Sequence, residues 1–162
     1  QQGDKVILDI LKRCGGKFKP VEGGLHFDRS LLKATEIDLA DCPDLGPILF
    51  TLGCFCSGET VIRNAGRLRL KESDRIEAMQ TELRKMGARI EVDGDTVHIQ
   101  GVALHAPNAP LSGHNDHRIV MALAVAAIAS GLPALLCGGR GRGQELARVL
   151  GACCAVLAPR WS

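Results

Sequence analysis

Aromatic side chains are nearly missing from this sequence of 162 residues, where they make up 3% of the chain with one Trp, four Phe and no Tyr. Proteins that bind single-stranded nucleic acid stack the bases on such rings, so this composition disfavours that class of function. The charge excess is also small, because the formal net charge is only +2 at pH 7. A protein that binds the phosphate backbone needs a stronger positive balance. We therefore expect no nucleic-acid partner, while a local cationic pocket for a small anion stays compatible with the sequence.

The cysteines lack any pattern that would predict a structural metal or a disulfide framework. Of the seven, three stand alone, two are separated by one residue and two are adjacent: Cys14, Cys42 and Cys137, then Cys54 and Cys56, then Cys153 and Cys154. An odd count without a recognisable signal peptide is typical of reduced thiols in a cytoplasmic protein. We therefore expect a cytoplasmic protein. We also expect Cys54 and Cys56 to be buried in the hydrophobic core.

An unbroken apolar run that could span a membrane is missing too. The most apolar stretch, 119–136, is interrupted by Ser130, Gly131 and Pro133, and alanine dominates its first half. The sequence therefore predicts a buried helix followed by a strand, and no membrane partner. An initiator Met is also lacking, and the chain opens inside a helical pattern. We expect it to be a piece of a longer protein.

An internal repeat is the main feature that the sequence does contain. Apolar spacing and turn residues predict a helix, a hairpin, a strand, a helix and a strand, at residues 4–13, 17–28, 36–39, 45–56 and 59–63. The same order recurs about 72 residues later, with helices at 74–86 and 116–129 around a hairpin at 89–99. We predict an α/β (α+β) fold of two units, about 1–65 and 66–137, with helices on one face of mixed sheets.

Positive charge stands in an unusual place at residues 71–75, Lys-Glu-Ser-Asp-Arg, where the helix of the second unit begins. Ser73 is predicted to be the N-cap of this helix. The N-terminal end of a helix carries partial positive charge, so Lys71 and Arg75 are unfavourable there unless an anion lies between them. A phosphate or carboxylate ligand would supply that anion. The alternative is a solvated helix start with surface ion pairs.

A second arginine-bearing helix start follows at residues 114–118, His-Asn-Asp-His-Arg. Asn115 or Asp116 can cap that helix, and Arg118 can donate two hydrogen bonds to one phosphate or carboxylate. Two such helix starts predict an anion pocket. His114 and His117 could instead ligate a metal, but no third ligand stands at a recognisable spacing. His117 fits better as a group that transfers a proton or donates a hydrogen bond.

Two carboxylates complete the pattern. Asp44 stands between a proline and an apolar helix, where it could simply be a helix cap, and Glu72 stands between the cations of residues 71–75. A pair of carboxylates beside cations is what acid–base chemistry on an anionic substrate needs.

Three motifs, in order, resemble those of the EPSP synthase (3-phosphoshikimate 1-carboxyvinyltransferase) family: residues 38–44, 71–75 and 114–122. The resemblance runs from about residue 2 to residue 136. It implies an inside-out domain of βαβαββ units, of which this chain holds about the last two. It also implies an active site in the cleft between two such domains, so that a complementary N-terminal domain or chain is needed.

The family resemblance implies transfer of the enolpyruvyl group of phosphoenolpyruvate to the 5-hydroxyl of shikimate 3-phosphate, with release of phosphate. This reaction belongs to aromatic amino acid biosynthesis, and the family is the target of glyphosate. Matching the motifs gives Asp44 and Glu72 as the proton-transfer groups. Lys71 would contact the substrate hydroxyl and phosphate region, and three further residues would bind phosphoenolpyruvate or lie beside it: Arg75, Arg118 and His117. Asn115 belongs to the same substrate-binding motif, and no metal or organic cofactor is implied.

The sequence departs from the family after about Cys137. A Lys-Ser-aromatic-Pro motif is expected there and is missing, and the segment 138–162 has the glycine- and arginine-rich look of GC-rich codons read in the wrong frame. We expect a frame-shifted, mobile tail. Two alternatives to the enzyme stay open at this point: an anion-binding module without catalysis, or an inert remnant. A transferase that acts on UDP-N-acetylglucosamine on the same fold is disfavoured by motifs 71–75 and 114–118.

Overall fold

The computed structural model describes residues 6–137, and the expected tail at 138–162 lies outside these residues. The elements of the first unit are α1 (Val6–Arg13), β1 (Lys17–Val21), β2 (Gly24–Asp28), β3 (Glu36–Asp38), the 3₁₀ turn η2 (Pro43–Leu45), α2 (Gly46–Phe55) and β4 (Glu59–Arg63). After the 3₁₀ segment η3 (Ala65–Leu70), the second unit contains α3 (Arg75–Arg84), β5 (Arg89–Asp93), β6 (Thr96–Gln100), β7 (Leu111–Ser112), α4 (His117–Ser130) and β8 (Leu136–Cys137). The observed elements thus follow the predicted order twice, while the division into domains stays a prediction.

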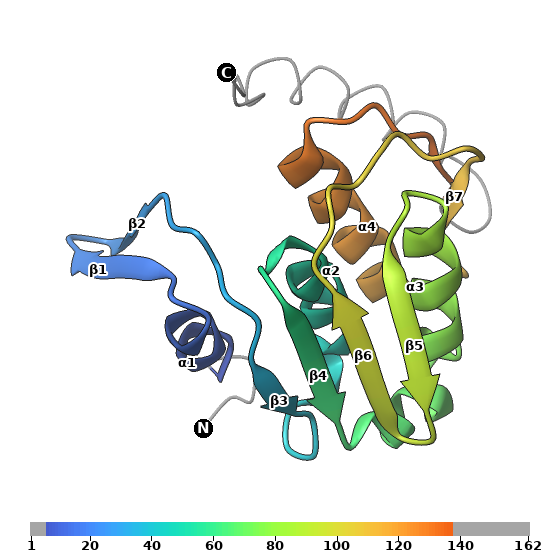
Figure 1. Ribbon diagram of the computed structural model, residues 1–162, viewed down its shortest axis with the longest axis horizontal. Coiled ribbons are helices and arrows are strands. Elements are labelled where there is room, and N and C mark those ends of the chain that lie inside the picture. The colour runs from blue at the N-terminus through green and yellow to red at the C-terminus, as the bar shows by residue number, and fades with distance from the viewer. Residues whose placement is uncertain (1–5, 138–162) are drawn as a thin grey trace.

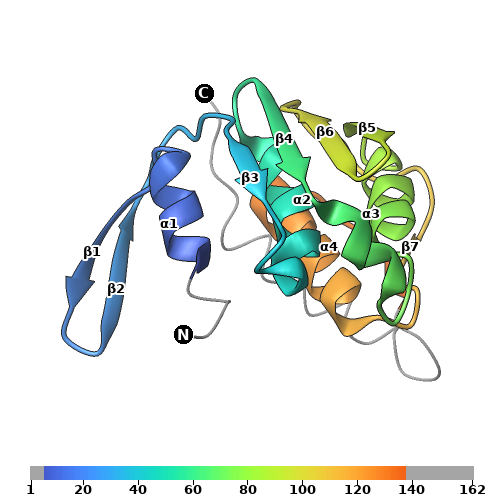
Figure 2. The same ribbon diagram turned by 90° about the horizontal axis from the view of Figure 1, so that it is seen from below.

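A mixed four-stranded sheet forms the centre of the molecule, in the order β3-β4-β6-β5 (Figure 1). β3 runs parallel to β4, whereas β6 pairs antiparallel with both of its neighbours. Figure 2 shows α2, α3 and α4 together on one face of this sheet. Alternate residues of β6, Val97 and Ile99, are completely buried under these helices, as a strand with one covered face requires. The predicted α/β fold with helices on one face of a mixed sheet is confirmed.

The hairpin β1–β2 repeats the hairpin β5–β6 at the level of single residues. Lys17 pairs with Asp28 in the first hairpin and Arg89 pairs with Gln100 in the second, each 72 positions further along. Their surroundings differ, because β1–β2 projects away from the central sheet (Figure 1). Phe27 is 54% exposed although Ile99, its equivalent in β6, is 0% exposed.

The apolar helix α2 is the inner layer that both units share. Its first turn contains Pro47, a position where a missing backbone N–H breaks no helical hydrogen bond. Gly53 leaves room for the close approach of Ile99 on the sheet, because a Cβ at that position would lie 3.1 Å from the Ile99 side chain. On the other side the Thr51 hydroxyl donates to the Ala122 carbonyl of α4 at 3.1 Å. These contacts hold α2 between the central sheet and α4.

The thiols of Cys54 and Cys56 are each 1% exposed, which confirms their prediction as core residues. Burial is the main cause that raises the pKa of each thiol to about 12. Both therefore remain protonated and unreactive at neutral pH.

One predicted helix cap is wrong by one residue. The N-cap of α3 is Asp74, whose Oδ1 accepts hydrogen bonds from the amides of Ile76 and Glu77 at 3.1 and 3.0 Å. The helix starts at Arg75, so Ser73 lies outside the capping position and its hydroxyl donates to Asp116 Oδ2 at 3.3 Å instead. Both side chains are good caps, and the carboxylate gains additionally from the helix dipole.

The run 119–136 divides as predicted into the end of α4 and the strand β8. Gly131 ends the helix with φ 63, a left-handed conformation that glycine adopts without strain. Within residues 6–137, none of the helices combines the length and the apolar character needed to cross a membrane.

Candidate active site

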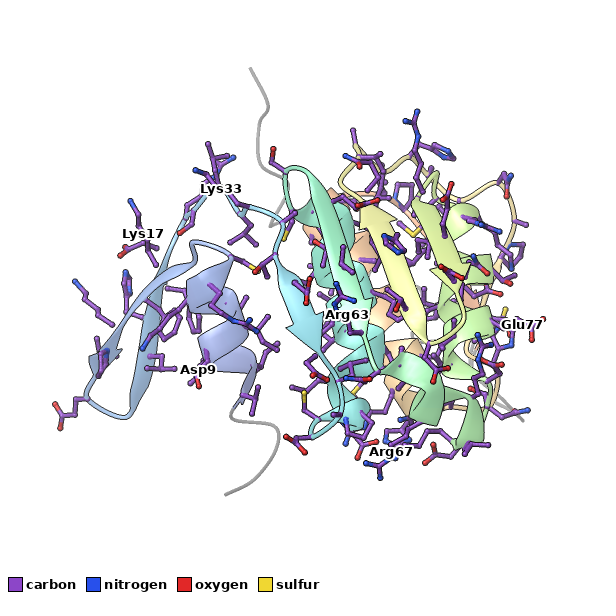
Figure 3. The ribbon with its side chains drawn as sticks, turned by 60° about the horizontal axis from the view of Figure 1, so that its bottom comes forward. Asp9, Lys17, Lys33, Arg63, Arg67 and Glu77 are labelled. Atoms are coloured by element: carbon purple, nitrogen blue, oxygen red, sulfur yellow. The ribbon has the colours of Figure 1, made fainter. Side chains whose placement is uncertain are left out.

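The buried guanidinium of Arg75 is the centre of the candidate site. Its Nε donates to Asp116 Oδ2 at 2.7 Å, its Nη1 to Asp44 Oδ1 at 3.1 Å and its Nη2 to Glu72 Oε2 at 2.6 Å. A further bond joins Nη2 to Asp116 Oδ1 at 3.3 Å. Arg75 begins α3, Asp44 belongs to η2 and Asp116 caps α4, so one side chain connects three helix starts. These starts lie near the end of the molecule that Arg67 marks in Figure 3.

The three carboxylates differ in their exposure to solvent. The Asp116 side chain is 0% exposed, whereas those of Asp44 and Glu72 are 46% and 54% exposed. A buried charge needs a partner, since removing one member of a buried ion pair costs about 3–5 kcal/mol. The pair of Arg75 and Asp116 is therefore the permanent part of the site. The two exposed carboxylates can move away when a competing anion arrives.

Lys71 and Arg118 bring two more cations to the same place. The Lys71 ammonium lies 3.1 Å from Asp44 Oδ1. Arg118 Nη1 donates to the backbone carbonyl of Asp44 at 3.3 Å. A neutral carbonyl is a weak partner for a guanidinium, so Arg118 retains much of its capacity to bind an anion.

Hydrogen bonds and charge both act on the acidity of these groups. The Lys71 ammonium lowers the pKa of Asp44 below its ordinary value of 3.8, with help from Arg75 and Arg118 and against partial burial. Burial raises the pKa of Asp116, but bonds from Arg75, the Arg118 amide and Ser73 outweigh it, so the pKa again lies below 3.8. Both groups are carboxylates at neutral pH. Asp44 can therefore accept a proton there, whereas Asp116 serves as a fixed negative charge.

The turn before α4 has an uncommon backbone. His114 and Asn115 adopt φ angles of 49 and 56, the left-handed region, which costs a residue with a side chain about 1–2 kcal/mol. The Asp116 amide then donates to the Gly113 carbonyl at 2.8 Å. Through its Oδ1, Asp116 accepts from the Arg118 amide at 2.9 Å and so caps the helix. Of the two predicted caps, Asp116 is the one that the structure uses.

The structure thus brings together five of the predicted site residues: Asp44, Lys71, Glu72, Arg75 and Arg118. It does not bring in the other two, since His117 and Asn115 are exposed and their side chains make no hydrogen bond within residues 6–137. Their predicted roles stay predictions. Neither does the described part of the chain hold a group of three or more His, Cys, Asp or Glu side chains arranged as metal ligands.

The sequence did not predict the side-chain contacts of two residues in this region, Asp116 and Glu82. Asp116 was predicted as a possible cap but not as the partner of Arg75, 41 positions away. Glu82, on α3, was not singled out at all, although its carboxylate contacts His114 at 2.9 Å. A buried position on the apolar face of a predicted helix was the signal available, since an acidic residue there needs a partner.

Known proteins similar to this chain include several EPSP synthases. A family model described as EPSP synthase (3-phosphoshikimate 1-carboxyvinyltransferase) matches residues 1–135. A 3-phosphoshikimate 1-carboxyvinyltransferase of Clostridium botulinum (strain Eklund 17B / Type B) is 40% identical over 136 residues, covering 83% of this chain and 31% of that protein. One from Clostridium acetobutylicum is 46% identical over 127 residues, covering 78% and 29%. The solved structure of EPSP synthase from Acinetobacter baumannii matches with a TM-score of 0.64 and 27% identity, covering 78% of this chain and 32% of that one. The chain spans less than a third of the length of these curated relatives.

Proposed function

Because this chain belongs to the EPSP synthase family, we propose that it forms part of a 3-phosphoshikimate 1-carboxyvinyltransferase. The complete enzyme would transfer the enolpyruvyl group of phosphoenolpyruvate to the 5-hydroxyl of shikimate 3-phosphate and release phosphate. The observation that carries the proposal is the Arg75 guanidinium, held by one buried carboxylate and covered by two exposed ones.

Phosphoenolpyruvate would bind by replacing carboxylate contacts on the cations. Its phosphate or carboxylate group can take the place of Glu72 or Asp44 on Arg75, while Arg118 and Lys71 supply further donors. Asp116 stays behind and keeps the guanidinium oriented. Positive charge so arranged also stabilises the negatively charged tetrahedral intermediate, which forms when the hydroxyl adds to the enolpyruvyl carbon.

Asp44 and Glu72 would carry the proton transfers. Asp44 is a carboxylate at neutral pH, with its pKa lowered further by Lys71, so it can accept the proton of the substrate hydroxyl as the new C–O bond forms. Glu72 in its protonated form would deliver that proton to the methylene carbon as the hydroxyl adds, and would be left as a carboxylate. When phosphate is eliminated, Glu72 would take a proton back from the newly formed methyl group, which restores the enol ether, and Asp44 would pass the hydroxyl proton to the leaving phosphate.

We further propose that this chain acts with a complementary chain segment, which the hairpin β1–β2 supports. In the second unit, β6 pairs with β4 and packs under helices, which buries Val97 and Ile99. At the equivalent positions of β2, Leu25 and Phe27 are 38% and 54% exposed. A further strand and helix, related to the hairpin as β4 and α2 are to β6, would cover this surface. The remaining two-thirds of a full-length relative is the natural source.

A phosphate-release assay tests both statements. The chain is incubated with phosphoenolpyruvate and shikimate 3-phosphate, alone and with the remaining domain of a close relative. Turnover that appears only with both parts supports the proposal, and the Asp44→Asn chain is the matched inactive control. Binding of phosphoenolpyruvate without turnover in either mixture would instead favour the alternative, an anion-binding fragment without catalysis.

A further inference from the structure

Glu82 is a buried carboxylate that the proposed reaction does not use. It lies on α3, and 1% of the residue is exposed. Its Oε2 accepts from Lys85 Nζ at 2.7 Å and from the Ser112 amide at 2.8 Å. Its Oε1 lies 2.9 Å from His114 Nε2. Because a carboxylate can only accept, the His114 ring must carry a proton on Nε2.

The chemistry of this contact argues for a specific purpose. A well-packed apolar side chain at such a position is often at least as stabilising as a buried ion pair. Glu82 nevertheless remains charged: burial raises its pKa, but Lys85, the Ser112 amide and His114 together lower it below the ordinary value of 4.5. Two of these three donors belong to loop 111–116, a segment made of the short strand β7 and the turn before α4. The carboxylate therefore attaches that loop to α3.

The loop positions two residues of the candidate active site, Asp116 and Arg118. It contains His114 and Asn115, both in the left-handed backbone conformation. Residues with a side chain keep this conformation only when the surrounding structure holds them in it. Immediately after them, Asp116 reaches Arg75 at 2.7 Å. Two residues later, Arg118 reaches the Asp44 carbonyl at 3.3 Å. Glu82 contacts the loop on both sides of Gly113, at Ser112 and at His114, the first residue of this turn.

Lys85 strengthens the same attachment. Besides its bond to Glu82, its ammonium donates to the Pro110 carbonyl at 3.0 Å. The Glu82 and Lys85 pair on α3 thus holds the chain from Pro110 to His114. This stretch leads directly into the start of α4.

We propose that Glu82 is a positioning residue for the candidate active site. It fixes loop 111–116 on α3, so that Asp116 meets Arg75 and Arg118 faces the bound anion. The effect on substrate rests on the proposed function, whereas the effect on the loop is a property of the fold. The two can therefore be tested separately.

The variants separate the effect of the Glu82 carboxylate from the effect of side-chain volume at that position. Glu82→Leu removes all three acceptor contacts at similar volume. Glu82→Gln keeps one oxygen for Lys85 and Ser112, and its amide can donate to a neutral His114 ring in the other tautomer. Glu77→Leu is the control, because Glu77 is an exposed acid on the same helix, on the outer side of α3 in Figure 3. His114→Phe removes one loop contact without placing an apolar residue at position 82, in case Glu82→Leu does not fold.

Amide hydrogen exchange of the 162-residue chain gives the first readout. In Glu82→Leu and in His114→Phe we expect exchange at Asp116 and Arg118, which do not touch Glu82, to become about tenfold faster, with the amides of β6 changed less than about twofold. Glu82→Gln should recover most of the protection, and Glu77→Leu should match the wild type. Equal acceleration in β6 and in the loop would mean a general loss of stability and would overturn the proposal. Unchanged exchange at Asp116 and Arg118 would overturn it as well.

Titration with phosphoenolpyruvate gives the second readout. We expect Arg118 resonances of the wild type to shift on addition, with about tenfold weaker binding in Glu82→Leu and recovery in Glu82→Gln. A wild type that does not respond, combined with the expected local exchange pattern, would contradict the proposed function and leave the positioning role intact. If the wild type and Glu82→Leu bind phosphoenolpyruvate with equal affinity, the result would contradict the positioning role alone.

Discussion

Arg75 and Asp116 form a completely buried ion pair that connects the starts of two helices. Nε and Oδ2 are 2.7 Å apart, and the side chains are 1% and 0% exposed. Such a pair is costly to break from one side, because the remaining charge is shielded from water and loses its buried partner. The stability of the fold and the geometry of the candidate site therefore depend on the same bond.

Asp116→Ala should lower the free energy of unfolding by about 3–5 kcal/mol, since it leaves the Arg75 guanidinium buried with only the exposed carboxylates as partners. Urea unfolding followed by circular dichroism measures this change. Glu36→Ala is the matched control: Glu36 contacts Arg63 at 2.6 Å, but both side chains are more than half exposed. We expect little change there. A loss of equal size in the two variants would contradict the role of burial.

Arg118→Ala should weaken binding of phosphoenolpyruvate while leaving the fold intact. Loss of a hydrogen bond to a charged group typically costs about 1.5–3 kcal/mol, which is roughly a tenfold to hundredfold change in Kd. Arg67→Ala is the control, because Arg67 also donates through Nη1 to a backbone carbonyl, that of Ala40, at 3.3 Å. Calorimetric titration of both variants decides the matter. Equal affinities would remove Arg118 from the site.

Asp44→Asn should lower turnover of the complemented enzyme by about 10²–10⁴-fold with ground-state binding largely unchanged, because the amide keeps the size of the side chain but cannot accept a proton. Steady-state phosphate release and direct ligand titration separate the two effects. Asp41→Asn, an exposed neighbour three residues earlier, is the control. If kcat is unaffected, Asp44 is a structural residue of η2 and nothing more.

Acid should destabilise the chain through Asp116. The pKa of this carboxyl in the folded chain lies below its ordinary value of 3.8, so its contribution to stability is complete above that value and disappears as the pH falls through the lower, folded pKa. We expect the free energy of unfolding to fall as the pH is lowered below about 4, and to fall less steeply in Asp116→Asn. Parallel curves for the two proteins would show that another carboxylate governs acid unfolding.

The coding DNA tests the frame-shifted tail. Codons allowed for residues 143–151 include GGC CAA GAG CTG GCC CGA GTT CTG GGA, which read one base later give Ala-Lys-Ser-Trp-Pro-Glu-Phe-Trp. This is the Lys-Ser-aromatic-Pro motif expected of the family. We predict that the displaced frame of the gene encodes it, and that restoring the frame tightens binding of phosphoenolpyruvate by adding a lysine. A gene whose displaced frame lacks the Lys-Ser-Trp-Pro run would rule out this origin.

Local structure followed from the sequence because the signals for it are local. Apolar residues at helical spacing, turns such as the one at Gly94, and stops such as Gly131 gave the element order and most boundaries. The one-residue error at Ser73 arose because serine and aspartate stand side by side and both are good caps. Nothing in the spacing alone can decide between such neighbours.

Contacts between distant residues did not follow from the sequence. The need for an anion beside Arg75 was predicted, but the anions found there are the chain's own: Asp116 lies 41 positions away and Asp44 lies 31 positions away. The contact of Glu82 with His114 spans 32 positions. Pairing at such distances depends on how α3 and α4 pack, which a helical pattern does not specify.

The protruding hairpin also has a consequence for solubility. Within residues 6–137, the outer edge of β2 has no strand beside it, and its apolar Leu25 and Phe27 are exposed. Lysines at positions 17 and 19 discourage strand addition at the β1 side, but β2 carries none. Aggregation of the isolated chain should therefore begin by strand addition at this edge, and a lysine in place of Phe27 should suppress it without disturbing the core under α2.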